Sequence, residues 1–134
     1  MAETLAGAWT GVYFYPHHPE HNPHDSWPPT PFTADLAEHE GKLSGRTREP
    51  DRERGDGVVL ASIAGRRRGA AVVFTKTPDG RRDAIVYVGQ LAAGGDRVEG
   101  EWHIHNDWSG TFRMDRVRKP APAVTIADAA GIKI

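Results

Sequence analysis

Four histidines close together near the N-terminus are the residues best suited to metal chemistry. They are His17, His18, His21 and His24, and Asp25 follows them directly. Imidazoles bind zinc, copper or nickel, and a carboxylate can complete such a site. The many prolines from 16 to 31 exclude a helix or a central strand, so no regular element fixes the spacing. A solvated loop with incidental histidines is the favoured interpretation. A metal site, or a lid whose histidines meet a ligand, are the alternatives.

Two further histidines, His103 and His105, stand two positions apart in a stretch that alternates apolar and polar residues. They share a strand face with Glu101, opposite Trp102. If Trp102 points inward, the histidines face solvent. In the opposite orientation His103 becomes a candidate acid or base, because an imidazole titrates near neutral pH. A metal held by this pair and a loop histidine is a third alternative.

Aromatic residues supply the candidate ligand-binding groups, and they recur on predicted strands. Tyr13 and Tyr15 share a face with Trp9, and their hydroxyls are also candidate catalytic groups. Such rings form either a plain core or a pocket in which a few phenols orient a ligand. Trp27 lies in the Pro/His-rich segment and is expected to cover the open end of the fold or to contact another chain. The full candidate set is Trp9, Tyr13, Tyr15, Trp27, Phe32, Tyr87, Trp102, Trp108 and Phe112.

Period-two alternation and regularly spaced turn residues predict strands throughout the chain and no helix before the tail. Many short strands with tight turns favour an all-β fold, a single eight-stranded antiparallel up-and-down barrel with a long Pro/His-rich loop between strands one and two. A β-sandwich is the alternative. The basic run Arg66–Arg68 is expected in a hairpin turn. The predicted strands are Ala8–Tyr15, Phe32–Glu38, Leu43–Arg48, Val58–Gly65, Ala70–Thr77, Arg82–Leu91, Arg97–His105 and Trp108–Met114.

Length and composition limit the remaining possibilities. A chain of 134 residues suggests one domain, here residues 1–117 followed by a linker-like tail at 118–134. The formal net charge of −1 gives no electrostatic case for nucleic acid. The absence of cysteine excludes disulfides and thiolate sites. No apolar run approaches the ~20 residues of a membrane span, and no signal peptide is expected, so a cytoplasmic location without a cofactor is predicted.

Several short motifs resemble the lipocalin and avidin families, the calycin-type small β-barrels. Gly7-Ala8-Trp9 is similar to their Gly-x-Trp signature, and the placement of Leu43-Ser44-Gly45, Glu101-Trp102 and Gly110-Thr111-Phe112 resembles avidins. The resemblance runs from Leu5 to Val117. It implies that Trp9 closes one end of a barrel and that Trp102 lines a cavity. Where avidins hold the ureido group of biotin, this chain has its Pro/His loop, so the resemblance implies a pocket but no particular ligand.

Three functional hypotheses follow from these observations. The first is a protein that binds a small apolar or aromatic molecule in the barrel, gated by residues 16–31. The second is a cofactor-independent enzyme of isomerase or cyclase type, in which pocket shape and a few Tyr or His groups act on a natural-product-like substrate. The third is an oligomeric interaction protein, a homo-oligomer among the options, that uses Trp27 and its loop as an interface.

Overall fold

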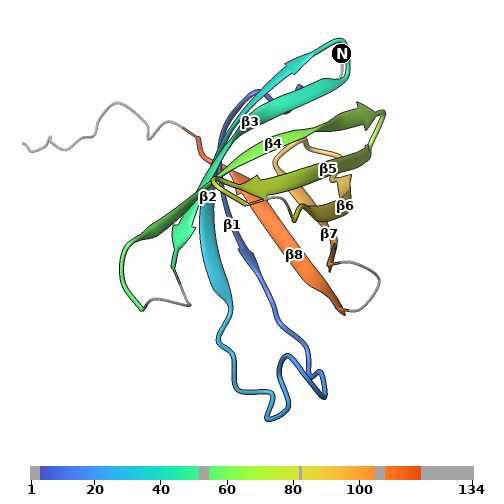
Figure 1. Cartoon of the computed structure of the whole chain (residues 1–134). Helices are drawn as coiled ribbons and strands as arrows, with labels where there is room; N and C mark the ends of the chain where they lie inside the picture. Colours follow the sequence, from blue (N-terminus) through green and yellow to red (C-terminus); the bar gives the residue numbers. More distant parts are fainter. Residues whose placement is uncertain (1–3, 52–54, 82, 105–107, 119–134) are drawn as a thin grey trace, which may run out of the picture.

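The computed structural model describes residues 4–51, 55–81, 83–104 and 108–118. In this part of the chain all the regular elements are strands, and no helix has the length and hydrophobicity to cross a lipid bilayer. The strands follow one another around a closed antiparallel barrel (Figure 1). They are β1 (Gly7–Tyr13), β2 (Thr30–His39), β3 (Lys42–Pro50), β4 (Val58–Arg68), β5 (Ala71–Pro78), β6 (Ile85–Leu91), β7 (Arg97–Ile104) and β8 (Trp108–Arg116).

Closure depends on β1, which pairs with β2 on one side and with β8 on the other. Tyr13 is level with Thr30 of β2 and with Phe112 of β8. The chain therefore forms one continuous sheet, which confirms the predicted up-and-down barrel and excludes the β-sandwich. A closed sheet has no edge strand on which another chain could add.

The predicted strands are confirmed, with shifted ends. The basic run Arg66–Arg68 was wrongly predicted as a turn, since it forms the end of β4 and the turn lies at Gly69. The strand period sends Arg67 toward the interior and its two neighbours outward. β6 begins at Ile85, not at Arg82. Residue His105 and positions 119–134, most of the predicted tail, lie outside the described residues.

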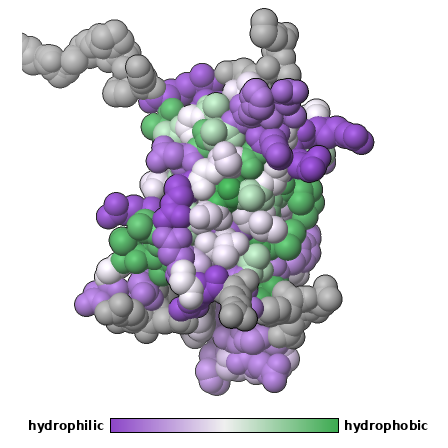
Figure 2. Space-filling view, turned by 45° about the horizontal axis from the view of Figure 1, so that its top comes forward, coloured by the Kyte–Doolittle hydropathy of each residue, from purple (hydrophilic) through white to green (hydrophobic). Residues whose placement is uncertain are grey.

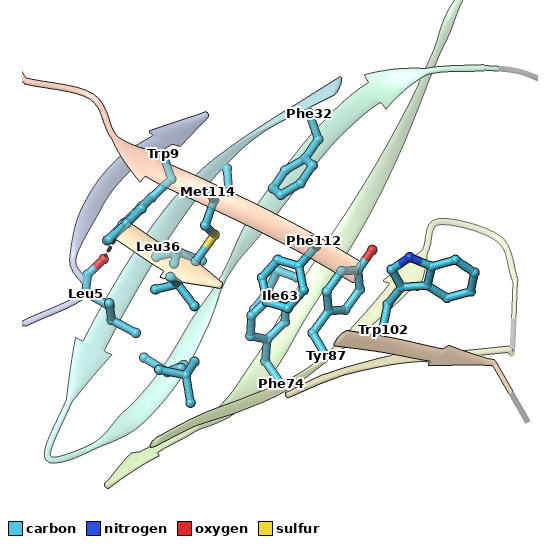
Figure 3. Packing of buried hydrophobic residues seen from close by; sticks show 14 of the residues in the cluster. Leu5, Trp9, Phe32, Leu36, Ile63, Phe74, Tyr87, Trp102, Phe112 and Met114 are labelled. Carbon is cyan, nitrogen blue, oxygen red and sulfur yellow. Dashed lines mark hydrogen bonds between the residues drawn. The ribbon is translucent and has the colours of Figure 1, made fainter. Parts of the chain in front are cut away.

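The core consists of alternate residues from all eight strands. On β2, Phe32, Ala34 and Leu36 are buried while the residues between them are exposed, as the sequence pattern predicts. Figure 3 shows large rings filling the middle of the barrel, among them Phe74, which stacks on Tyr87 with ring centroids 4.9 Å apart. The outer surface is a mixture of hydrophilic and hydrophobic side chains (Figure 2). A small space of about 10 Å³ lies among core residues that include Phe32, Phe74 and Met114.

Two glycines make room for core rings. A Cβ atom at Gly11 would lie 2.4 Å from the Phe32 ring, and one at Gly110 would lie 2.6 Å from the Trp102 ring. Both distances are shorter than any normal contact, so a side chain at either position would displace the ring. Gly110 thereby allows Trp102 to lie against β8.

Trp9 closes one end of the barrel. Its side chain is fully buried, and its indole N–H donates to the Leu5 carbonyl at 2.9 Å. The Arg116 guanidinium lies 4.6 Å from the centre of the Trp9 ring and donates to the carbonyls of Thr4 and Ala6 at 2.7 and 3.0 Å. These contacts bind the N-terminal segment over this end and agree with the role that the resemblance implied for Trp9.

A buried ion pair reinforces the same end. Arg67 of β4 donates to both carboxylate oxygens of Glu38 on β2, at 2.9 and 2.8 Å. Glu38 also accepts the Leu5 backbone N–H at 2.8 Å. The hydrogen bonds from Arg67 lower the pKa of Glu38, and burial opposes that shift without cancelling it. The pair thus links two strands and the N-terminal segment.

We predict that Glu38→Gln destabilises the protein by about 3–5 kcal/mol, because it leaves the Arg67 guanidinium almost buried without a counter-ion. The lowered pKa of Glu38 stabilises the fold above the ordinary glutamic acid value of about 4.3, and this contribution is lost as the pH falls through the lower folded-state value. Urea unfolding from pH 7 to pH 3 measures both effects. Glu40→Gln, at an exposed carboxylate, is the control. Equal losses for the two variants would contradict the prediction.

Candidate functional site at the mouth of the barrel

The open end of the barrel contains a cavity of about 230 Å³, which we call the mouth cavity. Six aromatic side chains line it, together with the charged residues Glu49, Asp51, Lys76 and Arg81. Its volume is somewhat below the roughly 300–1,000 Å³ of pockets for drug-sized molecules. The cavity therefore suits a molecule of one or two rings. The six aromatic residues are Tyr13, Tyr15, Trp27, Tyr87, Trp102 and Trp108.

A network of buried polar groups forms the floor of the mouth cavity. The Lys76 ammonium donates to Glu49 Oε1 at 2.6 Å, and the Tyr13 hydroxyl donates to Glu49 Oε2. Lys76 Nζ also lies 4.5 Å from the centre of the Tyr13 ring and 5.4 Å from that of Tyr87. The side chains of Lys76 and Glu49 are only 5% and 11% exposed, so a cation and an anion are paired here almost out of water.

The environment of this network keeps its donors protonated. Burial, and then the Glu49 carboxylate, raise the pKa of the Tyr13 phenol well above its usual range. Burial lowers the pKa of Lys76, but the Tyr87 oxygen and the Glu49 carboxylate raise it by more, and the net shift is upward. Burial raises the pKa of Tyr87 although Lys76 opposes it. At neutral pH the floor therefore presents two phenols and an ammonium–carboxylate pair.

Aromatic rings form the walls above this floor. Tyr15 stacks on Trp108 at 5.6 Å and meets the edge of Trp27 at 5.3 Å between centroids. Trp102 meets Trp108 edge-on at 5.2 Å. Trp27 remains 44% exposed, so its ring is the outermost part of the wall. These contacts place Trp27 over the open end, one of the two positions that the sequence suggested for it.

Asn22 organises residues 14–29, which connect β1 to β2. It is fully buried; its side-chain amide donates to the carbonyls of Tyr15 and Pro16 at 3.3 and 3.1 Å, and its Oδ1 accepts the Ser26 N–H at 3.0 Å. From the barrel side, the Trp102 indole donates to the Phe14 carbonyl at 3.0 Å. The segment projects beyond the barrel (Figure 1). These bonds position it against the mouth.

Among the described residues, three side chains of the segment between β1 and β2 lie close enough together to hold a metal ion. They are His18, Glu20 and His21. Their candidate ligand atoms lie within 4.8 Å of one another. His17, His24 and Asp25, also suggested by the sequence, are not part of this group. Nδ1 of His18 accepts the N–H groups of Glu20 and His21, each at 3.1 Å. A metal ion at Nδ1 of His18 would therefore have to displace these two hydrogen bonds.

Three predicted ligand-binding residues lie elsewhere. Trp9, Phe32 and Phe112 are buried in the core and do not line the mouth cavity. The interior of an eight-stranded barrel is narrow enough for large rings to fill it, which leaves space only at its end. Of the two orientations that the sequence allowed for His103, the structure shows the outward one: its side chain is 43% exposed and lies 3.3 Å from Glu101. The alternative of an inward-facing acid or base is thereby excluded for His103.

Several residues of the site were not predicted from the sequence, among them Lys76, Glu49 and Asn22. A signal existed for the first two. Lys76 continues the buried alternation of Val72 and Phe74 on β5, and the burial period of β3 places Glu49 on the inner side after Thr47. A charged residue in phase with core residues indicates a buried pair. The sequence carries no comparable signal for Asn22, because its bonds are made within an irregular segment.

The closed eight-stranded antiparallel meander confirms the barrel fold that the resemblance implied. No protein-family model matches the chain, and no curated protein matches it. Among solved structures, the chain is similar to a crystal structure of a mutant of the fluorescent protein UnaG. The sequence identity is 11%, the TM-score is 0.45, and the match covers 85% of this chain and 96% of that chain.

We predict that Lys76→Met destabilises the protein by about 3–5 kcal/mol, since the Glu49 carboxylate then stays buried without its cation. Adding Glu49→Gln should restore a large part of that loss, because no uncompensated charge remains. The raised pKa of Lys76 stabilises the fold at pH values below the ordinary lysine value of about 10.4, and this contribution disappears as the pH rises through the higher folded-state value. Denaturant unfolding measures each variant. Lys42→Met, at an exposed lysine, is the control; additive losses in the double variant would contradict the prediction.

Proposed function

We propose that this protein binds a small aromatic molecule in the mouth cavity, with residues 16–31 as its adjustable wall. The observation that carries the proposal is the convergence of six aromatic rings on one cavity with a polar floor. Rings recognise a flat ligand by stacking and edge contacts, and a few buried polar groups fix its orientation. A cytoplasmic location remains a prediction.

The floor favours a neutral ligand over a charged one. Glu49 already neutralises Lys76 at 2.6 Å, so an anionic ligand gains little from the ammonium. A cationic ligand likewise gains little from the Glu49 carboxylate, because Lys76 already neutralises it. A neutral hydroxyl or carbonyl group can instead exchange hydrogen bonds with Tyr13 or Lys76 at no cost in burying a further charge. We therefore propose a one- or two-ring molecule with an uncharged polar group.

The test compares three probes that share the naphthalene ring system and differ in charge, by isothermal titration calorimetry at pH 7. They are neutral 2-naphthol, anionic 2-naphthoate and protonated 2-naphthylmethylamine. The neutral probe is expected to bind most tightly. Trp27→Ala should weaken its binding by about 2- to 10-fold, the value of one aromatic contact. Leu60→Ala removes an exposed side chain on the outer wall and should have no effect. Equal binding of all three probes, or equal effects of both variants, would contradict the proposal.

A second candidate function is a cofactor-independent enzyme of isomerase or cyclase type. The hydrogen-bonded network of Tyr13, Glu49 and Lys76 at the cavity favours it, because this network combines a carboxylate with two proton donors. In such an enzyme the Glu49 carboxylate would accept a proton from an acidic C–H group. Lys76 gives one of its three N–H groups to Glu49 and would donate another to the oxygen on which negative charge develops. Tyr13 would turn its single O–H from Glu49 to the same oxygen.

The probe for this function is 2-tetralone, a neutral two-ring ketone with acidic C–H groups, whose hydrogen–deuterium exchange in D₂O is followed by NMR. An enzyme should accelerate the exchange above the buffer rate. Tyr13→Phe should lower the accelerated rate by about 100-fold while the ketone still binds. The control is Tyr15→Phe, because the Tyr15 hydroxyl contacts Thr30 at 2.7 Å and does not contact Glu49. If 2-tetralone binds but its exchange is not accelerated, the result supports the binding function and contradicts the enzymatic function.

A further inference from the structure

The outer wall of the barrel carries an exposed apolar stripe on β5 and β6. Val73, Val86 and Val88 are 45%, 36% and 44% exposed. Val73 is level with Val88, and Val86 is level with Thr75. Contiguous apolar side chains on a protein surface mark sites of interaction. None of these residues lines the mouth cavity, so the stripe needs its own explanation.

Charges of opposite sign flank the stripe. One row across the sheet runs from Arg66 on β4 through the two valines to Glu101 on β7. The next row runs from Arg68 through Ala71 and Gln90 to Glu99. The side chains of both rows face outward and are exposed. A third row, from Ala64 through Thr75 and Val86 to His103, has no such pair of opposite charges. We call this surface the β4–β7 face. It consists of Arg66, Arg68, Ala71, Val73, Thr75, Val86, Val88, Gln90, Glu99 and Glu101.

We propose that the β4–β7 face joins two copies of this chain into a symmetric dimer, with the two-fold axis parallel to the strands and midway between β5 and β6. Rotation about this axis places β4 of one copy opposite β7 of the other, and β5 opposite β6. Each row of one copy then lies opposite the same row of the other copy. Arg66 then faces Glu101 of the second copy, Arg68 faces Glu99, and Val73 faces Val88. Each contact occurs twice, as two-fold symmetry requires.

The order of charges across the face favours a second copy over another partner. Both rows have a cation at the β4 edge and an anion at the β7 edge, with uncharged residues between them. A face with this order is complementary to itself under the stated rotation, whereas an unrelated partner would need the same order by coincidence. The apolar centre with a charged rim is also the usual composition of a protein interface. No residue of the β4–β7 face lines the mouth cavity.

The experiment measures the dimer dissociation constant of the full chain by sedimentation velocity. Arg66→Glu and Glu101→Arg each place like charges opposite one another twice in the dimer, and each should raise that constant by about tenfold or more. An equimolar mixture of the two variants should restore the wild-type value, because every introduced charge then faces its opposite. Arg48→Glu makes the same change on β3, outside the face, and should have no effect.

Each remaining outcome overturns the proposal. A wild-type protein that stays monomeric at about 100 μM has no such dimer, since specific interfaces persist at that concentration. A dimer that tolerates both single variants uses another surface. If Trp27→Ala dissociates the dimer and Arg66→Glu does not, the interface lies at the mouth of the barrel instead. Assembly that continues beyond two copies excludes a closed two-fold contact. Circular dichroism and thermal unfolding confirm that the variants, altered only at exposed positions, remain folded.

Discussion

The pairing of β1 with β8 is the interaction on which the rest of the structure depends. It turns a meander with two open edges into a closed barrel, and it commits alternate side chains to a narrow interior. Large rings fill that interior, and the small space between them measures about 10 Å³. Space for a molecule therefore remains at one end, where the mouth cavity measures about 230 Å³. The closed sheet thus places the open space of the barrel at its mouth before any particular side chain lines it.

Each end of the barrel contains a nearly buried ion pair, and the two pairs have different surroundings. At the closed end, Glu38 and Arg67 also bind the N-terminal segment through Leu5, so the pair is enclosed by the chain itself. At the open end, Glu49 and Lys76 lie beneath aromatic walls and beside the mouth cavity. Both pairs satisfy charges that are taken out of water. Only the second is placed where a bound molecule can share its hydrogen bonds.

The alternation of strand residues separates two proposed surfaces that use the same strands. On β5, Val72, Phe74 and Lys76 point inward, to the core and the floor of the mouth cavity, while Val73 points outward to the β4–β7 face. A change on one side of the sheet therefore leaves the chemistry of the other side in place. The binding proposal and the dimer proposal consequently depend on different side chains and can fail separately.

The sequence by itself determined the strands and the inward set on β2, because period-two alternation is local and turn residues separate the strands. It favoured a closed barrel over a β-sandwich, but the pairing of β1 with β8 decided between them. The sequence also supplied the aromatic candidates. Only the tertiary structure decided which of them meet: Tyr13, Tyr15 and Trp108 surround the mouth cavity, whereas Phe32 lies in the core. The contact of Lys76 with Glu49 joins residues 27 positions apart. Such contacts depend on strand register and on closure of the barrel, which bring distant residues together and which no local pattern specifies.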